Sequence, residues 1–128
     1  MEFKTPEELR YTKDHEWISS DGDVITIGIT DFAQSQLGDI VFVELPEVGT
    51  TVENNSPFGV VESIKSVSDL IAPVSGEIVE VNTDLDNAPE QCNSAPFKAW
   101  MIKIRCSNLD ELDSLLSAQD YLPLCQEN

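Results

Sequence analysis

Lys65 is the strongest candidate for a chemically functional residue in this sequence, because of the residues around it. It is the only Lys or Arg between Lys13 and Lys98, in a stretch otherwise rich in Asp and Glu. A nucleophilic lysine needs a pKa lowered by burial or by a neighbouring cation, whereas its charged neighbours Glu62 and Asp69 are acidic and favour the ammonium form. Lys65 is therefore a poor nucleophile. Acylation by another enzyme requires only that the side chain protrudes.

Two β-type runs flank Lys65 and would present it at the tip of a hairpin. Residues 59–64 and 66–71 are rich in Val, Ile and Leu, as strands are. Neither Asn-Gly nor Asp-Gly marks a turn between them, so one long strand fits the pattern nearly as well. On this pattern alone, an exposed solubilising lysine is the simplest interpretation.

The composition excludes several other functions. The 128 residues include 24 Asp and Glu but 7 Lys and Arg, giving a formal net charge of -17, which nucleic acids and anionic membranes would repel. One histidine, His15, and three widely spaced cysteines offer little material for a zinc site or a histidine-based triad. No apolar run approaches the roughly 20 residues of a membrane helix. We expect a cytoplasmic protein, or a mitochondrial-matrix protein if a transit peptide has been removed.

The elements that position Lys65 indicate a mainly β domain with short helices. Residues 5–8 carry the signals of a short N-terminal helical turn. Residues 11–18 and 24–29 predict strands paired as a hairpin, and residues 30–37 predict a short helix that Gly38 ends. The Pro, Gly and Asn residues that follow separate strands at the spacing of a sandwich or barrel.

Two further patterns complete the predicted architecture. Residues 38–43 and 76–81 repeat a Gly-acid-Ile-Val motif, which suggests two similar half-sheets or a strand start that recurs by chance. Residues 107–116 predict a C-terminal helix with its leucines on one face. The length predicts one domain over residues 1–128.

Around Lys65 the sequence resembles the lipoyl-attachment segment of the H protein of the glycine cleavage system. The similarity continues in order and at family-like spacing through five blocks: residues 15–17, 27–34, 37–46, 59–69 with 72–77, and 100–104. The resemblance covers about residues 11–121, which it makes the core of the domain, with 122–128 as a C-terminal tail. It implies a barrel-sandwich hybrid of two half-sheets, with lipoate in amide linkage to Lys65. It assigns Glu62, Ser63 and Asp69 to the attachment site.

By this resemblance the chain is a non-catalytic carrier with four enzyme partners. A lipoate-attaching enzyme would modify Lys65, and the lipoyl arm would take an aminomethyl group from glycine decarboxylase, offer it to the aminomethyltransferase and be reoxidised by dihydrolipoyl dehydrogenase. The resemblance also implies a cleft for the loaded arm formed by Asp14, Glu16 and Asp69. His15 is either a structural imidazole or a residue of the cleft rim. Neither a metal, a nucleic acid nor a membrane is expected.

The sequence departs from the family pattern at one place, and three other functions are alternatives to that of the H protein. Residues 97–99 are Phe-Lys-Ala where the family usually has Gly-acid-Gly, and a positive φ at Ala99 would cost on the order of 1 kcal/mol. This departure leaves open an H-like lipoyl protein used for lipoate relay or regulation. A biotin carrier usually has Met on both sides of the lysine, unlike Ile64 and Ser66. A lipoyl domain of a 2-oxo acid dehydrogenase is shorter and usually has Asp-Lys-Ala at the tip.

Overall fold

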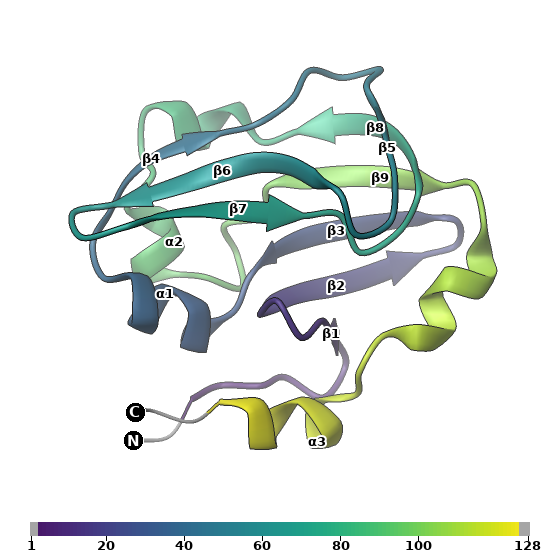
Figure 1. Cartoon of the computed structure of the whole chain (residues 1–128), viewed down its shortest axis with the longest axis horizontal. Helices are drawn as coiled ribbons and strands as arrows, with labels where there is room; N and C mark the ends of the chain where they lie inside the picture. Colours follow the sequence, from purple (N-terminus) through teal and green to yellow (C-terminus); the bar gives the residue numbers. More distant parts are fainter. Residues whose placement is uncertain (1–2, 126–128) are drawn as a thin grey trace.

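The computed structural model describes residues 3–125, which form two antiparallel β-sheets that face each other (Figure 1). One sheet has the strand order β1-β2-β3-β9-β8-β5 and the other β4-β6-β7. The strands are β1 (Arg10–Tyr11), β2 (Glu16–Asp21), β3 (Val24–Ile29), β4 (Ile40–Glu44), β5 (Thr51–Val52), β6 (Pro57–Ser63), β7 (Val67–Ile71), β8 (Gly76–Val81) and β9 (Ile102–Cys106). The helices are α1 (Asp31–Leu37), η1 (Thr83–Asp86), α2 (Gln91–Ser94), η2 (Leu109–Ser114), α3 (Ala118–Tyr121) and η3 (Leu122–Leu124).

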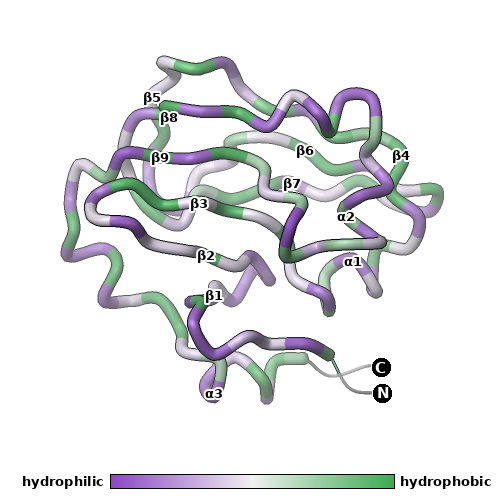
Figure 2. Tube along the Cα trace, turned by 180° about the vertical axis from the view of Figure 1, so that it is seen from behind, coloured by the Kyte–Doolittle hydropathy of each residue, from purple (hydrophilic) through white to green (hydrophobic). Residues whose placement is uncertain are grey.

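Apolar side chains from both sheets fill the space between them. Hydrophobic and hydrophilic residues alternate along β9 (Figure 2), and its isoleucines point inward because successive strand residues face opposite sides. Ile104 of β9 and Val61 of β6 belong to the same buried cluster. A smaller second cluster joins Tyr11, Trp17, Ala118 and Tyr121. In the part of the chain that the structure describes, no helix is long and apolar enough to cross a membrane.

The hairpin and the helix predicted in the first third of the chain are both present. Strands β2 and β3 pair from Glu16–Ile29 to Asp21–Val24. The Thr30 side chain caps α1 by accepting a hydrogen bond from the Ala33 N–H (3.1 Å). Gly38 ends this helix at φ 78°, a conformation that glycine adopts most readily. These local signals therefore specify the structure that forms.

Two N-terminal predictions differ from the structure. Residues 5–8 do not form the expected helical turn. The chain makes one hydrogen-bonded turn there, in which the Leu9 N–H donates to the Pro6 carbonyl (3.3 Å). The expected strand over residues 11–18 is interrupted, because β1 ends at Tyr11 and β2 begins at Glu16. The intervening turn includes His15, whose φ of 67° is left-handed and breaks the strand.

The internal repeat corresponds to one strand in each sheet. β4 contains a bulge between Ile40 and Phe42, and β8 contains one between Ile78 and Glu80. These are equivalent positions of the repeated motif, so both copies bend at the same residue. The two sheets nevertheless differ in size, because the hairpin of β2 and β3 extends only the sheet that contains β8.

The prediction of a C-terminal helix over residues 107–116 is wrong. The segment forms the 3₁₀ helix η2, which begins after Asn108 and not after Ser107, and Leu115 is extended. Glu111 explains why the chain takes this path: its carboxylate accepts hydrogen bonds from the Ser75 N–H (2.7 Å) and hydroxyl (3.1 Å), which ties η2 to the start of β8. The short helices α3 and η3 follow, and residues 126–128 of the predicted tail lie outside the described residues.

Candidate functional site

The two runs around Lys65 form the hairpin of β6 and β7, with Lys65 in the turn (Figure 1). The Ser63 side chain organises this turn, which contains no glycine or asparagine. Its hydroxyl oxygen accepts hydrogen bonds from the N–H groups of Lys65 (3.3 Å) and Ser66 (3.1 Å), and its proton is donated to the Ser66 carbonyl (3.3 Å). A serine turn of this kind replaces the Asn-Gly chemistry that the sequence lacks.

The Lys65 side chain is exposed and lies over the end of α1. A Cβ added to Gly38 would be 3.2 Å from Lys65 Cε, so the absence of a side chain there leaves room for the lysine. The Ile64 N–H donates to the Asp39 carbonyl (3.0 Å), which fixes the turn against the same segment. Within residues 3–125 the only ion pair joins Lys103 to Glu80, so the Lys65 ammonium is not held by a carboxylate.

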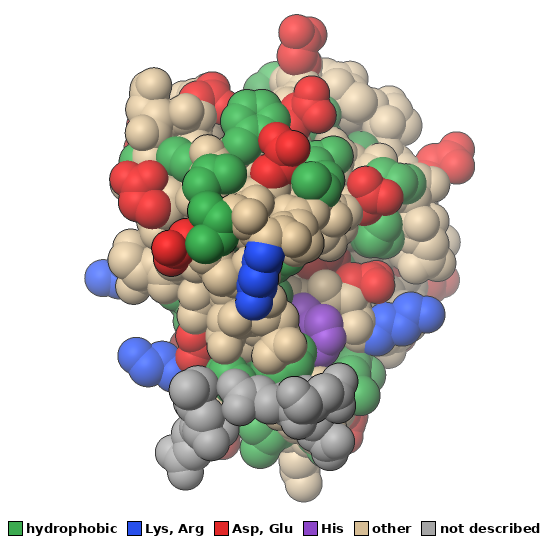
Figure 3. All heavy atoms as spheres, turned by 60° about the vertical axis from the view of Figure 1, so that its left-hand side comes forward, with side chains coloured by type: hydrophobic (Ala, Val, Ile, Leu, Met, Phe, Trp, Pro, Cys, Tyr) green, Lys and Arg blue, Asp and Glu red, His purple; other side chains and the backbone are tan. Residues whose placement is uncertain are grey.

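Apolar side chains surround the lysine on the surface. Ile64 is 71% exposed and Val67 is 65% exposed, and both adjoin the turn. Phe42 of β4 is also exposed and lies in one cross-strand row with Glu62 and Val67. Figure 3 looks from the side of this turn and shows hydrophobic and acidic side chains together on the surface, with few basic ones. Glu62 is half-buried and makes no hydrogen bond to Lys65 in the described structure.

A cleft of about 180 Å³ lies beside the lysine turn, between β7, α1 and the turn that precedes β2. We call it the β7–α1 cleft. It contains all three acidic residues that the sequence analysis assigned to one cleft, and Leu37 in its wall directly precedes the Gly38 on which Lys65 lies. The residues that line it are Asp14, His15, Glu16, Ile29, Phe32, Ala33, Gln36, Leu37, Val61, Ser68, Asp69 and Leu70.

The three acidic residues of the cleft differ in environment. Asp14 and Asp69 are exposed, whereas Glu16 is only 2% exposed. Glu16 Oε2 accepts a hydrogen bond from the Ile71 N–H (2.9 Å), and Oε1 lies 3.4 Å from the Thr12 hydroxyl. Burial raises the pKa of Glu16 to about 8, because the low-polarity surroundings disfavour the carboxylate. Glu16 therefore joins β2 to β7, while the exposed aspartates supply the negative charge.

The sequence analysis missed the helical wall of the cleft. Four residues of α1, Phe32, Ala33, Gln36 and Leu37, face the cavity. Their spacing places them on one side of a helix, so the pattern was visible, but no local signal indicated what this side of α1 would face. His15 lines the cleft, and its Nδ1 also lies 2.8 Å from the Tyr121 hydroxyl oxygen, so the imidazole has a structural partner as well as a place in the cleft wall.

Ala99 does not occupy a strained position. His15 and Asn55 are the only residues other than glycine with a positive φ within residues 3–125. Ala99 is buried, and its N–H donates to the Ala95 carbonyl (2.9 Å). The departure from the family pattern at residues 97–99 therefore carries no cost from a left-handed backbone. Nearby, the buried Trp17 donates its indole N–H to the Pro96 carbonyl (2.9 Å), since a buried tryptophan usually finds a partner for this group.

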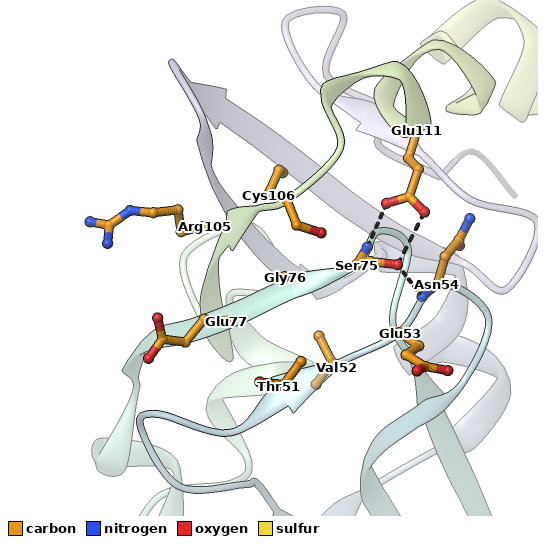
Figure 4. A pocket seen from close by; sticks show the side chains of 11 residues that line it. Thr51, Val52, Glu53, Asn54, Ser75, Gly76, Glu77, Arg105, Cys106 and Glu111 are labelled. Carbon is orange, nitrogen blue, oxygen red and sulfur yellow. Dashed lines mark hydrogen bonds between the residues drawn. The ribbon is translucent and has the colours of Figure 1, made fainter.

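A larger cavity of about 770 Å³ lies away from Lys65, between β5, β8, β9 and η2 (Figure 4). Its central contact is that of Glu111 with Ser75, whose hydroxyl oxygen also accepts a hydrogen bond from the Asn54 N–H (3.0 Å). Arg105 and Glu77 point away from this contact (Figure 4). The polar groups at its centre bond to one another, and these hydrogen bonds connect η2 to the segments that precede β8 and follow β5.

The geometry at the lysine turn suits attachment of a group. An exposed primary amine is fixed at its base by the Ser63 turn and is free at its end. The adjacent cleft has an apolar wall and exposed carboxylates, which together fit an apolar chain ending in a cation. Within residues 3–125 no three His, Cys, Asp or Glu side chains gather as metal ligands.

Comparison with known proteins gives a consistent result. The family model described as glycine cleavage H-protein matches residues 9–128. The glycine cleavage system H protein of Geobacillus thermodenitrificans is 60% identical over 126 residues, covering 98% of this chain and 99% of that protein. The one from Staphylococcus carnosus is 53% identical over 123 residues, covering 95% and 98%. A crystal structure of a glycine cleavage system H protein from Mycobacterium marinum superposes with a TM-score of 0.83 at 44% identity, covering 91% of this chain and 94% of that one.

Proposed function

The chain belongs to the glycine cleavage H-protein family, and from this premise we propose that it is a single-domain carrier whose Lys65 bears lipoate in amide linkage. The family and the mainly β fold of two facing sheets are as the sequence predicted. The observation that carries the proposal is the position of Lys65, exposed and unpaired at a defined turn beside a cleft.

The residues around Lys65 fit the proposed group. An attaching enzyme must bring the lysine amine into its own active site, and the protruding turn with exposed Ile64 and Val67 leaves room for this approach. Ser63 fixes the backbone from which the side chain starts, so that only the lysine chain itself moves. Lipoate would supply a redox-active disulfide on a long arm, the chemistry that accepts an aminomethyl group from glycine and passes it on.

The β7–α1 cleft is proposed as the resting place of the end of that arm. Asp14 and Asp69 would attract a protonated amine, and the apolar face of α1 would pack against the rest of the chain. Glu16 would contribute a hydrogen-bonding carboxyl group, held in place by the Ile71 N–H. Partial shielding from water strengthens such charge-assisted contacts, which contribute about 1.5 to 3 kcal/mol each.

The proposed carrier makes no bond itself and depends on four enzymes. These are a lipoate-attaching enzyme, glycine decarboxylase, the aminomethyltransferase and dihydrolipoyl dehydrogenase. A tethered arm raises the local concentration of the carried group at each docked active site, which is the physical advantage of a carrier over a diffusible intermediate. Glu62 would act on the surface that these enzymes approach, since it shares a row with the exposed Phe42 and Val67.

Reconstitution of the system tests this function. The lipoylated chain should support glycine-dependent reduction of NAD when mixed with the three enzymes of glycine cleavage and with tetrahydrofolate, which accepts the one-carbon unit as ammonia is released. The Lys65→Arg variant keeps the positive charge but cannot form the lipoyl amide, and it should support none. Activity with Lys65→Arg equal to that of the lipoylated chain would contradict the proposal.

A further inference from the structure

The hydroxyl group of Tyr121 connects the C-terminal segment to two walls of the β7–α1 cleft. Tyr121 is the last residue of α3 and is fully buried. Its oxygen lies 2.8 Å from Nδ1 of His15, which lines the cleft, and 2.7 Å from the hydroxyl oxygen of Thr30. Thr30 caps α1, the helix that forms the apolar wall. A single side-chain oxygen thus touches both the turn before β2 and the start of α1.

The direction of these hydrogen bonds follows from counting protons. Thr30 is buried, and within residues 3–125 its hydroxyl has two partners, the Ala33 N–H, from which it accepts (3.1 Å), and Tyr121. The Thr30 proton is therefore satisfied only if Thr30 donates to Tyr121. The proton of Tyr121 then has His15 Nδ1 as its acceptor. Within residues 3–125 this order gives each hydroxyl one donated and one accepted bond. A neutral imidazole that accepts at Nδ1 carries its proton on Nε2.

The backbone around His15 is also held in a defined conformation. Its φ of 67° is left-handed, which is unusual for a residue with a side chain. The His15 carbonyl accepts from the Thr30 N–H (3.1 Å), and the His15 N–H donates to the Thr12 carbonyl (3.1 Å). The ring itself packs against Phe32 with centroids 4.7 Å apart. Backbone contacts thus fix the turn, while Tyr121 fixes the ring.

We propose that Tyr121 is a positioning residue for the cleft, which holds the His15 ring in one orientation and as the neutral Nε2–H tautomer. The inference rests on the proposed function, in which the cleft receives a protonated amine. An imidazolium in the cleft wall would repel that amine. By keeping the ring neutral, Tyr121 leaves the carboxyl groups of Asp14 and Asp69 as the charges that the amine meets.

The surroundings of His15 determine the expected change when the Tyr121 hydroxyl is removed. The titratable groups around the ring are Asp14 and Glu16 on its own segment, Tyr121 from α3 and Asp69 from β7. Burial lowers the pKa of His15, and the nearby Asp14 opposes this effect. A ring released from Tyr121 can turn toward solvent and toward Asp14. The pKa of His15 should then rise, and its proton should exchange between the two nitrogens.

Tyr11 provides a matched control for Tyr121→Phe. It is fully buried in the same cluster, and its ring stacks on that of Tyr121 with centroids 4.6 Å apart. Its hydroxyl donates to the Pro6 carbonyl (2.7 Å) and does not reach the cleft. Tyr11→Phe and Tyr121→Phe therefore each lose one hydroxyl hydrogen-bond donor from the same packed cluster. Only the second change should alter His15.

The test is ¹⁵N NMR of the histidine ring in the full, unmodified chain. The wild type should show a single Nε2–H tautomer. Tyr121→Phe should show a tautomer mixture and a pKa of His15 raised by on the order of half a unit or more, a threefold change in the ionisation constant, and Tyr11→Phe should match the wild type. An Nδ1–H tautomer in the wild type would overturn the proposal even if Tyr121→Phe failed to fold. Unchanged His15 signals in a folded Tyr121→Phe, or equal changes in both variants, would overturn it as well.

A second measurement separates this inference from the proposed function. In the lipoylated protein, Tyr121→Phe should shorten retention of the aminomethyl group about threefold or more at pH 6, relative to Tyr11→Phe. Retention that is equal in the two variants would contradict a positioning role. The proposed function is judged instead by lipoylation of Lys65, which can fail while the NMR result on the unmodified chain stands.

Discussion

At the residue scale, Glu16 shows how burial changes the use of a carboxyl group. Its side chain bonds to the Ile71 N–H and is almost inaccessible, so the burial that raises its pKa to about 8 also fixes its orientation. Near neutral pH it is mainly protonated and acts as a brace between β2 and β7. The exposed Asp69 has no such constraint and remains the group that acts through its charge.

The ionisation of Glu16 predicts a pH-dependent stability. The folded state keeps this proton up to about pH 8, whereas the unfolded chain releases it near 4.5. Between these values the unfolded state binds fewer protons, so this group lowers the free energy of unfolding as pH rises. Glu16→Gln cannot ionise but still offers an oxygen to Ile71. In urea unfolding, the free energy of unfolding of the variant, relative to that of the wild type, should increase by on the order of a few kcal/mol between pH 5 and pH 9. A constant difference across this range would contradict the assignment.

Asp69 should govern how long the cleft retains a protonated amine. We expect Asp69→Asn to release ammonia and formaldehyde from the loaded, lipoylated protein about tenfold faster, corresponding to a loss of about 1.4 kcal/mol. High salt should reduce this effect because Asp69 is exposed. Glu44→Gln is the control, since Glu44 lies in the same cross-strand row, beyond Val60, and does not line the cleft. Equal release rates in the two variants would exclude a protective cleft.

At the element scale, the hairpin of β6 and β7 depends on a side chain for its turn. Ser63 binds two backbone N–H groups and one carbonyl, all within three residues. β4 supports the hairpin from the side by pairing with β6, and the Asp39 carbonyl accepts from the Ile64 N–H. The lysine is therefore presented by a short turn that hydrogen bonds hold in place, and not by a loose loop.

Ser63→Ala should loosen this presentation. We expect a loss of about 1 kcal/mol in unfolding free energy, the contribution of one or two exposed hydrogen bonds, and a severalfold lower rate of lipoylation by a purified lipoate ligase. Ser66→Ala is the control, because the hydrogen bonds of Ser66 in this turn are made by its backbone. A rate for Ser63→Ala as high as that for Ser66→Ala would show that the turn needs no side-chain support.

The same elements show what the sequence could and could not predict. The hairpin of β2 and β3 and the helix α1 follow from local signals, because their turns and caps lie within the segment. The segment after β9 does not: its leucines suggested an α-helix, but Glu111 bonds to Ser75, and residues so distant leave no local pattern. For the same reason the sequence carries no local sign of the bond from Tyr121 to His15. Only the family resemblance assigned Asp14, Glu16 and Asp69 to one cleft.

At the scale of the whole molecule, the two facing sheets form a packed base from which one exposed lysine protrudes. Most buried residues of the two sheets form one continuous cluster, whereas Lys65 protrudes from the end of the smaller sheet. The chain has a net charge of -17, and Lys65 is the only Lys or Arg between Lys13 and Lys98, so a partner with a basic surface would be steered toward the molecule. Recognition and modification of the turn should leave the core unaffected.

Lipoylation should therefore change the stability very little. Amide formation removes one positive charge from an exposed turn, where charge pairs contribute at most about 1 kcal/mol. A change of ~1 kcal/mol would shift the melting temperature of a domain of this size by roughly 3 to 6 °C. Calorimetry of the modified and unmodified chains should give a smaller difference than this. A shift well above that range would mean that the attached arm reorganises the core.

The most direct test of the account is mass spectrometry of the chain after reaction with lipoate and a lipoate ligase. The intact mass should show one lipoyl group, and peptide mapping should place it on Lys65. Lys98→Arg, which changes another exposed lysine, should be modified as the wild type is. Lys65→Arg should remain unmodified, because Arg cannot form the amide. A lipoyl group on any other lysine, or on the Lys65→Arg variant, would contradict the central claim that Lys65 is the attachment site.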